Sequence, residues 1–168
     1  MVNKTVSKFV SSKYAIFAIH GGGIEVGTSQ IAKSIARDNF SLYIKEGKDY
    51  SEHVTSILFT DIKANELLAK IETIISIHGL KDKSKSYVMI GGLDIELTSK
   101  IEDSLIGDGF IIEQPPESLD GDNKNNICNK GKSLKGVQIE ISRKLREDLY
   151  RNKELMLKFS EAIRNPLY

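Results

Sequence analysis

The feature that most constrains the fold is a series of short apolar runs separated by stretches with helical periodicity. Isoleucine, valine and aromatic residues occupy consecutive positions in these runs, which is typical of strands covered on both faces. The alternation of such strands with helices favours an α/β fold: a single-domain three-layer sandwich with a mixed, mostly parallel sheet. The expected strands cover residues 14–19, 40–45, 72–77, 87–92, 109–114 and 137–142.

Amphipathic patterns between the apolar runs predict the helices. The first helix should begin at a cap formed by Thr28 or Ser29, because short hydroxyl side chains satisfy free N–H groups there. The third should stop at Gly107 or Gly109, since glycine commonly ends helices. The expected helices span residues 28–39, 64–72, 94–109 and 152–165.

The charge balance limits the classes of partner. The chain has 24 basic and 23 acidic residues and a net charge of +1, which argues against binding nucleic acid through bulk charge. No segment approaches the roughly 20 apolar residues that a membrane span needs. With 168 residues and 40% hydrophobic content, the chain is long enough to bury a core. We therefore expect the protein to bind neither nucleic acid nor a membrane. We also expect a monomer.

Cysteine content and the N-terminal residues bear on the compartment. The single cysteine, Cys128, cannot form an internal disulfide. Residues 1–14 are basic but lack the continuous apolar core of a signal peptide. We expect synthesis in the cytoplasm without a signal peptide, which fits either a cytoplasmic enzyme or a protein released by host lysis.

One long polar segment, residues 115–136, interrupts the alternation of strands and helices. Loops of this length in compact domains are usually functional or disordered. A strand pattern resumes at Val137, so the segment does not look like a domain boundary. We expect one domain over residues 1–168, with residues 115–136 as a long loop beside the active site. Its lysines form either a solvated surface or a contact with an anionic polymer: Lys124, Lys130, Lys132 and Lys135.

Two of the three histidines share a sequence context. His20 in "AIHGG" and His78 in "SIHGL" each end an apolar strand and precede a glycine. Because the carboxyl ends of parallel strands form the ligand-binding crevice, both side chains can converge there. Glu25 can join them if the glycines fold the turn back, since glycine adopts backbone angles that a β-carbon forbids. Two histidines and a carboxylate form a zinc site with an open fourth position.

Other interpretations of these residues remain open. A single histidine at a strand end is more often a hydrogen-bonded structural residue than a metal ligand. His53, in "SEHVTS", is either a surface residue or a member of the site. Cys128 could act as a nucleophile with a histidine, but it lacks a local motif.

The glycines also permit a phosphate-binding interpretation. "GGIEVGT" has the Gly-x-x-x-x-Gly spacing followed by a threonine, ahead of a helix whose N-terminus could hold an anion. The lysine that a phosphate loop requires is absent, however, and Glu25 would place a negative charge in the cradle. Val26 stands where the third glycine of a dinucleotide motif belongs. The metal interpretation is therefore favoured.

The last expected strand carries polar residues where apolar ones are expected. Gln138 and Glu140 share one face, because side chains alternate along a strand. Near a metal, Glu140 would serve as the general base that takes a proton from the attacking water. Arg143 and Arg146 follow, and their guanidinium groups suit a substrate carboxylate or a developing oxyanion. The alternative is a structural ion pair between Glu140 and Arg143.

Several blocks match a known family when taken together and in order. The chain resembles the phage poly-γ-glutamate hydrolases, also labelled phage-related replication proteins, a family similar to compact zinc carboxypeptidases. The matching blocks are "HGGGIEVGTSQIAKSIA", "HVTSILFTD", "SIHG", "GGLD", "NICNKG" and "GVQIEISRKLR".

The resemblance implies zinc held by His20, Glu25 and His78, and hydrolysis of the γ-glutamyl amide bonds of poly-γ-glutamate. It implies Glu140 as the catalytic base. We expect Arg143 to be the second catalytic residue, although which of Arg143 and Arg146 binds the substrate carboxylate and which stabilises the oxyanion stays open. The candidates for substrate binding are His53, Arg146, Asn129 and Lys130. Three alternatives remain: a non-catalytic binding protein with the same fold, a replication-associated nucleic-acid binder, and an amidase for another γ-glutamyl or peptidoglycan-type substrate.

Overall fold

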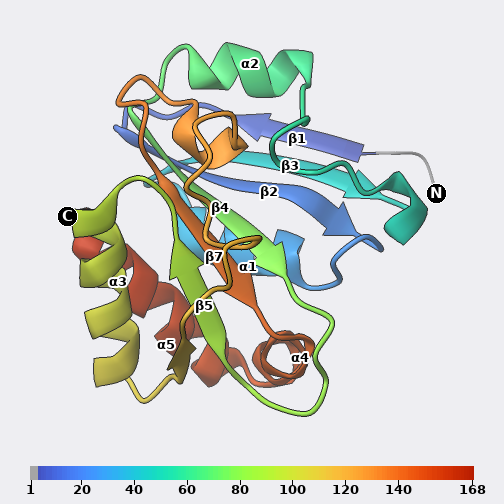
Figure 1. Cartoon of the computed structure of the whole chain (residues 1–168), viewed down its shortest axis with the longest axis vertical. Helices are drawn as coiled ribbons and strands as arrows, with labels where there is room; N and C mark the ends of the chain where they lie inside the picture. Colours follow the sequence, from blue (N-terminus) through green and yellow to red (C-terminus); the bar gives the residue numbers. More distant parts are fainter. Residues whose placement is uncertain (1–3) are drawn as a thin grey trace.

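The computed structural model describes residues 4–168, which form a seven-stranded sheet in the order β1-β3-β2-β4-β7-β5-β6 (Figure 1). The strands are β1 (Lys4–Lys8), β2 (Tyr14–Gly22), β3 (Ser41–Gly47), β4 (Thr73–Gly79), β5 (Val88–Gly91), β6 (Ile112–Glu113) and β7 (Val137–Ile141). Only the β1–β3 and β5–β7 pairs are antiparallel among these strands. The expected mixed, mostly parallel α/β sheet is confirmed.

Helices pack on both faces of this sheet (Figure 1). They are α1 (Thr28–Ala36), α2 (Ile62–Leu68), α3 (Ile95–Gly107), α4 (Arg143–Arg151) and α5 (Lys153–Arg164), with 3-10 turns η1 (Tyr50–Glu52), η2 (Ile127–Asn129) and η3 (Asn165–Leu167). Within residues 4–168, no helix combines the length and the apolar character needed to cross a bilayer.

The two faces of β2 explain its continuous apolar sequence. Ile16 and Ala18 belong to one core, which α1, α3, α4 and α5 cover. Phe17 and Ile19 point the other way, into a second core with residues of α2 and η2. Since side chains alternate across a strand, a strand between two cores must be apolar at every position. The central strands therefore carry little polar sequence until their carboxyl ends.

Some elements differ from the sequence predictions. β1 was not predicted; it is an edge strand of alternating polarity that pairs only with β3. The run at 109–114 forms just the short strand β6. The cap of α1 is Gly27, with a φ of 99°, and Thr28 is the first helical residue. α2 begins earlier than predicted, because the Asp61 carboxylate accepts hydrogen bonds from backbone N–H groups of its first turn.

The carboxyl ends of β2, β4 and β7 lie side by side at one edge of the sheet. His20 lies near the end of β2 and His78 near the end of β4. Glu140, on β7, is paired in register with His78. Three side chains that are far apart in sequence are thereby brought to one place.

Candidate metal centre

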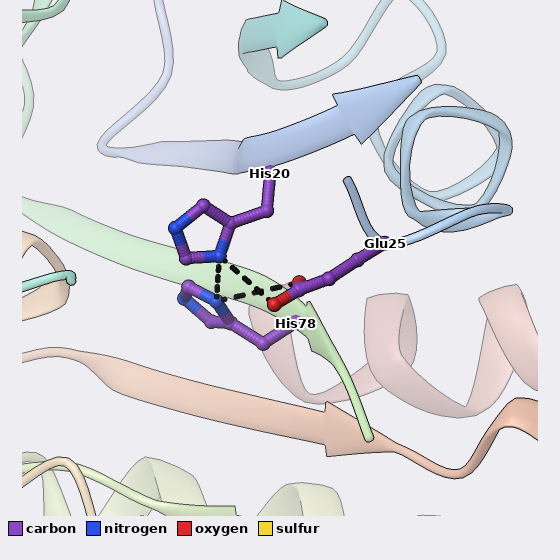
Figure 2. A group of neighbouring side chains, drawn as sticks. All are labelled: His20, Glu25 and His78. Atoms are coloured by element: carbon purple, nitrogen blue, oxygen red, sulfur yellow. Dashed lines mark hydrogen bonds and ion pairs between the residues drawn. The ribbon is translucent and has the colours of Figure 1, made fainter. Parts of the chain in front are cut away.

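His20, Glu25 and His78 form a buried cluster whose ligand atoms all lie within 4.8 Å of one another (Figure 2). The two histidines face each other through Nδ1, at 3.2 Å. Glu25 Oε1 lies 3.0 Å from Nδ1 of His20, and Oε2 lies 3.8 Å from Nδ1 of His78. A tetrahedral zinc site has ligand–ligand edges of about 3.3–3.6 Å, so these distances fit a zinc ion.

The turn after β2 brings Glu25 back toward His20. Gly22 has a φ of +68°, a conformation that glycine adopts without strain. The backbone N–H of Glu25 then donates to the carbonyl of His20 at 2.9 Å, and the Thr28 hydroxyl donates to the carbonyl of Glu25 at 2.8 Å. The glycine-rich turn therefore brings the two side chains together, and the carboxylate points to the histidines and not into the turn.

Hydrogen bonds behind the ligands orient each of them. Nε2 of His20 donates to the carbonyl of Val54 at 2.7 Å, so in the neutral form that binds a metal the lone pair is on Nδ1, which faces Glu25 and His78. Nε2 of His78 lies 2.8 Å from the Ser76 hydroxyl. Oε2 of Glu25 accepts from the Gly79 N–H at 2.9 Å. Such outer contacts fix the tautomer and the direction of a metal ligand.

The protonation states also suit a cation. Burial lowers the pKa of His78 to about 4, so its imidazole is neutral at pH 7. Burial opposes the charged form of Glu25, but the hydrogen bond with His20 and the neighbouring His78 bring the pKa of Glu25 below its ordinary value. A neutral imidazole and an ionised carboxylate are the forms that bind metal.

His53 belongs to the same site. Its ring stacks on that of His20 with centroids 4.0 Å apart, and on that of Tyr50 at 4.9 Å. Nε2 of His53 lies 3.6 Å from Oε1 of Glu25. Burial, followed by the neighbouring His20, lowers the pKa of His53. Of the two interpretations of His53, the structure supports a place in the site.

Glu140 lies beside the cluster, and no basic side chain of residues 4–168 is at ion-pairing distance from it. It is 6% exposed and accepts a hydrogen bond of 3.3 Å from Nε2 of Gln138. Burial and the charge of Glu25 raise the pKa of Glu140 to about 8. The alternative ion pair with Arg143 is wrong, because Nε of Arg143 donates to Glu147 at 2.7 Å instead.

A cavity of about 480 Å³ opens over these residues. Its walls include His20, Glu25, His53, His78 and Glu140. The segment after η1 contributes Ser56 and Ile57, and the loop 115–136 contributes Ser118, Leu119 and Asn126. The cluster is therefore reachable by a substrate, and the long loop forms part of its wall.

Arg146 does not line this cavity. Its buried guanidinium donates to the carbonyls of Val26, Leu80 and Ile141, the last at 3.1 Å. These carbonyls belong to the turn after Glu25 and to the residues that follow His78 and Glu140. Arg146 thus ties together the three segments that carry the site, and each of its three nitrogens already donates to a backbone carbonyl.

Two other residues singled out in the loop lie outside the cavity. The side-chain amide of Asn129 donates to the carbonyl of Gly121 at 2.8 Å and accepts from the N–H of Gly136 at 3.0 Å, so it holds the loop 115–136 in shape. Lys130 is exposed and does not line the cavity. Cys128 is buried, and burial raises the pKa of its thiol to about 12, which does not suit a nucleophile.

Sequence reasoning missed three residues near the cluster. Ser76 had a usable signal: it is a polar residue on a buried strand, two positions before His78 and on the same face. Tyr50 and Lys81 had none, because both lie outside regular strands and only the fold brings them to the cavity.

The fold is shared with a broad group of amidase-like and metallopeptidase-like structures. An N-formylglutamate amidohydrolase from Ralstonia eutropha aligns with a TM-score of 0.56 at 10% identity, covering 97% of this chain and 98% of that one. The CwlD amidase from Clostridioides difficile aligns with a TM-score of 0.51 at 12% identity, covering 92% of this chain and 96% of the other. At such identities the likeness is one of fold.

The chain belongs to the poly-γ-glutamate hydrolase family, whose sequence profile matches residues 3–164. The family predicted from the sequence blocks is thereby confirmed. A solved bacteriophage poly-γ-glutamate hydrolase aligns with a TM-score of 0.91 at 29% identity, covering 98% of this chain and 87% of that chain. A structure of YndL described as apo and zinc-free also aligns with a TM-score of 0.91 at 28% identity, covering 98% of this chain and 89% of that chain.

Sequence relatives occur in Bacillus subtilis strain 168. The SPbeta prophage-derived UPF0714 protein YoqZ is 39% identical over 147 residues, which are 84% of this chain and 53% of YoqZ. The UPF0714 protein YndL is 32% identical over 151 residues, which are 86% of this chain and 59% of YndL. The chain therefore spans little more than half the length of these relatives.

Proposed function

We propose that this protein is a zinc-dependent hydrolase that cleaves the γ-glutamyl amide bonds of poly-γ-glutamate. The observation that carries the proposal is the convergence of His20, Glu25 and His78 beside the buried carboxyl group of Glu140. Membership of the poly-γ-glutamate hydrolase family supports the substrate. The description of the YndL structure as zinc-free supports zinc as the metal of that relative, and by extension of this chain.

The ligand set suits zinc more than magnesium or calcium. Imidazole nitrogens are good ligands for zinc, whereas magnesium and calcium prefer oxygen. Zinc held by His20, Glu25 and His78 would supply Lewis acidity at the floor of the cavity that these residues line.

Glu140 is the proton carrier in this proposal. It lies next to His78 and lines the cavity, and its Oε1 accepts only the bond from Gln138 among the described residues. Glu140 takes a proton from the attacking water and delivers it to the departing amide nitrogen, so the carboxylate is regenerated after each turnover. A bound cation would bring the pKa of Glu140 down from its raised value toward neutrality, because positive charge favours the carboxylate.

The arginines have different roles in this proposal. Arg146 acts on the protein itself, through the backbone carbonyls of the segments that carry the ligands. Arg143 lies on the first turn of α4 and lines a neighbouring pocket instead of the main cavity. His53 is better placed than either arginine to donate a hydrogen bond to a carbonyl oxygen at the cluster.

Two measurements on one preparation test this function. The protein is purified without chelators and without a histidine tag, and its zinc content is determined by elemental analysis. The chain length of poly-γ-glutamate is then followed by size-exclusion chromatography. About one zinc per chain and shortening of the polymer are expected. A folded protein that takes up no zinc, or a zinc-loaded protein that leaves the polymer intact, would contradict the proposal.

A further inference from the structure

A second pocket of about 230 Å³ adjoins the cavity over the metal cluster. The two share Glu25, Tyr50, Gly79 and Lys81 as lining residues, so they form one continuous groove. Lys83, Arg143 and Arg146 line the second pocket but not the main cavity. The groove is therefore cationic on the side that leads away from the cluster toward α4.

Stacked rings connect the cluster to this cationic side. The ring of His53 lies between those of His20 and Tyr50. Nζ of Lys81 lies 3.8 Å from the centroid of the Tyr50 ring, which is a cation–π contact. Lys81 is thus positioned at the junction of the two pockets by an aromatic face, and the N–H donors that point away from the ring can reach a ligand.

The two lysines of the second pocket differ from its two arginines in their partners. Within residues 4–168, no carboxylate lies at ion-pairing distance from Nζ of Lys81 or Lys83. Arg143 bonds Glu147 through Nε, and its two terminal nitrogens have no hydrogen-bond partner in the described chain. Arg146, in contrast, is already bonded to three carbonyls.

The part of the main cavity formed by the loop 115–136 has a different character. Ser118, Leu119 and Asn126 line the main cavity but not the second pocket, and none of these side chains is charged. Two lysines of the same loop pair with carboxylates elsewhere: Lys132 with Glu72 at 3.9 Å and Lys135 with Asp94 at 3.5 Å.

The remaining lysines of the loop, Lys124 and Lys130, line neither pocket. The cationic contact with an anionic polymer that the sequence suggested for this loop is therefore better provided by the segment that follows β4.

We propose that Lys81, Lys83 and Arg143 form a carboxylate-binding subsite beside the metal cluster. The inference rests on the proposed function and deepens it. Each residue of a γ-linked glutamate chain keeps a free α-carboxylate, so the polymer presents one anionic group per repeat. The subsite binds such carboxylates on one side of the scissile bond, because the basic side chains gather in the second pocket whereas the loop residues that line only the main cavity are uncharged.

The experiment measures binding separately from cleavage. Glu140→Gln is introduced into every protein so that the polymer survives, and affinity for size-fractionated poly-γ-glutamate is measured by calorimetry. The double variant Lys81→Ala/Lys83→Ala is compared with Lys124→Ala/Lys130→Ala, which removes the same charge from the loop 115–136. A third pair, Lys63→Ala/Lys158→Ala, removes the same two positive charges from exposed positions on α2 and α5. Lys81→Arg/Lys83→Arg restores the charge.

We expect Lys81→Ala/Lys83→Ala to weaken binding about tenfold, as two moderately strong exposed ion pairs would. The affinity should also depend less on salt, because screening acts on the charges removed. The other two alanine pairs should remain within about twofold, and the arginine pair should recover most of the affinity. In proteins that keep Glu140, KM should rise about tenfold while kcat changes little.

The possible outcomes separate the two proposals. The subsite would be overturned if all three alanine pairs lost affinity equally, or if Lys81→Ala/Lys83→Ala kept the affinity of the parent protein. Cleavage of the polymer by the parent protein would still support the proposed hydrolase in that case. Lysine-dependent binding without cleavage by the zinc-loaded parent would keep the subsite and overturn the hydrolase. If the zinc-loaded parent protein neither binds nor cleaves the polymer, both proposals are overturned.

Discussion

His78 and Glu140 are direct partners across the parallel β4–β7 pair, and both side chains are almost fully buried. Residues in register on adjacent parallel strands place their side chains on the same face of the sheet. A candidate metal ligand and an unpaired carboxyl group therefore lie next to each other on two rigid elements. This relationship, and not the loop geometry, sets the position of the proposed proton carrier relative to the metal.

Glu140→Gln should abolish most activity while zinc binding persists. The substituted amide keeps the shape and the bond with Gln138 but cannot accept a proton, so we expect turnover to fall about 10²–10⁴-fold. Zinc content by elemental analysis and polymer cleavage by chromatography check both parts. His20→Ala is the comparison and should lose zinc and activity together. Full turnover in Glu140→Gln would show that another group carries the proton.

The metal-free protein should lose stability as the pH rises from neutrality toward 8. The pKa of Glu140 is raised to about 8, above the ordinary value, so the folded state holds a proton that the unfolded state has released. The free energy of unfolding then falls with pH by up to about 1.4 kcal/mol per unit. Urea denaturation at pH 6.5 and pH 8 measures this slope.

Glu140→Gln is the control for that slope, because it keeps the fold and removes the titrating group. The histidines contribute equally to both proteins: the pKa values of His78 and His53 are lowered, so stability rises with pH through the ordinary histidine value in the parent protein and in Glu140→Gln alike. Parallel slopes for the parent protein and Glu140→Gln would contradict the assignment.

Ser76→Ala should weaken zinc binding without unfolding the protein. The Ser76 hydroxyl lies 2.8 Å from Nε2 of His78 and helps to orient its ring. Loss of a contact behind a metal ligand typically costs about 10–100-fold in affinity. Competition with a fluorescent zinc chelator measures the change. Ser160→Ala is a matched control, because Ser160 is also buried but bonds Ser34, away from the cluster.

Arg146→Gln should destabilise the fold and the metal site together. The substitution frees the carbonyls of Val26, Leu80 and Ile141, and each buried carbonyl without a partner costs about 1–3 kcal/mol. We expect a loss of about 3 kcal/mol or more in urea denaturation, together with weaker zinc binding.

Two further variants are compared with Arg146→Gln in the same stability measurement. Arg146→Lys should lie between it and the parent protein, since an ammonium group keeps the charge but not the planar fork. Arg143→Gln should change stability by only about 0.5 kcal/mol, because it loses one partly exposed pair with Glu147. If Arg146→Gln were as stable as Arg143→Gln, Arg146 would not be holding the site together.

Much of the fold follows from the sequence alone. A strand such as β2 lies between two cores, so it has to be apolar at consecutive positions, and that pattern is visible without coordinates. The family was also evident, because its motifs occur in order along the chain. His20 and His78 could be assigned to one edge of the sheet because strand ends in a parallel sheet meet there. Glycines next to Glu25 indicated a turn that the structure contains.

Other features were decided by the tertiary structure. β1 has a polar, alternating sequence, and it becomes a strand only because β3 offers a free edge. The roles of Arg143 and Arg146 depend on which carbonyls and carboxylates come within reach, and two guanidinium groups three positions apart read alike in sequence. Lys81 reaches the groove because the chain turns after β4 toward Tyr50. Local patterns report burial and backbone preference, whereas the partners of a long polar side chain come from distant segments that only the folded chain brings together.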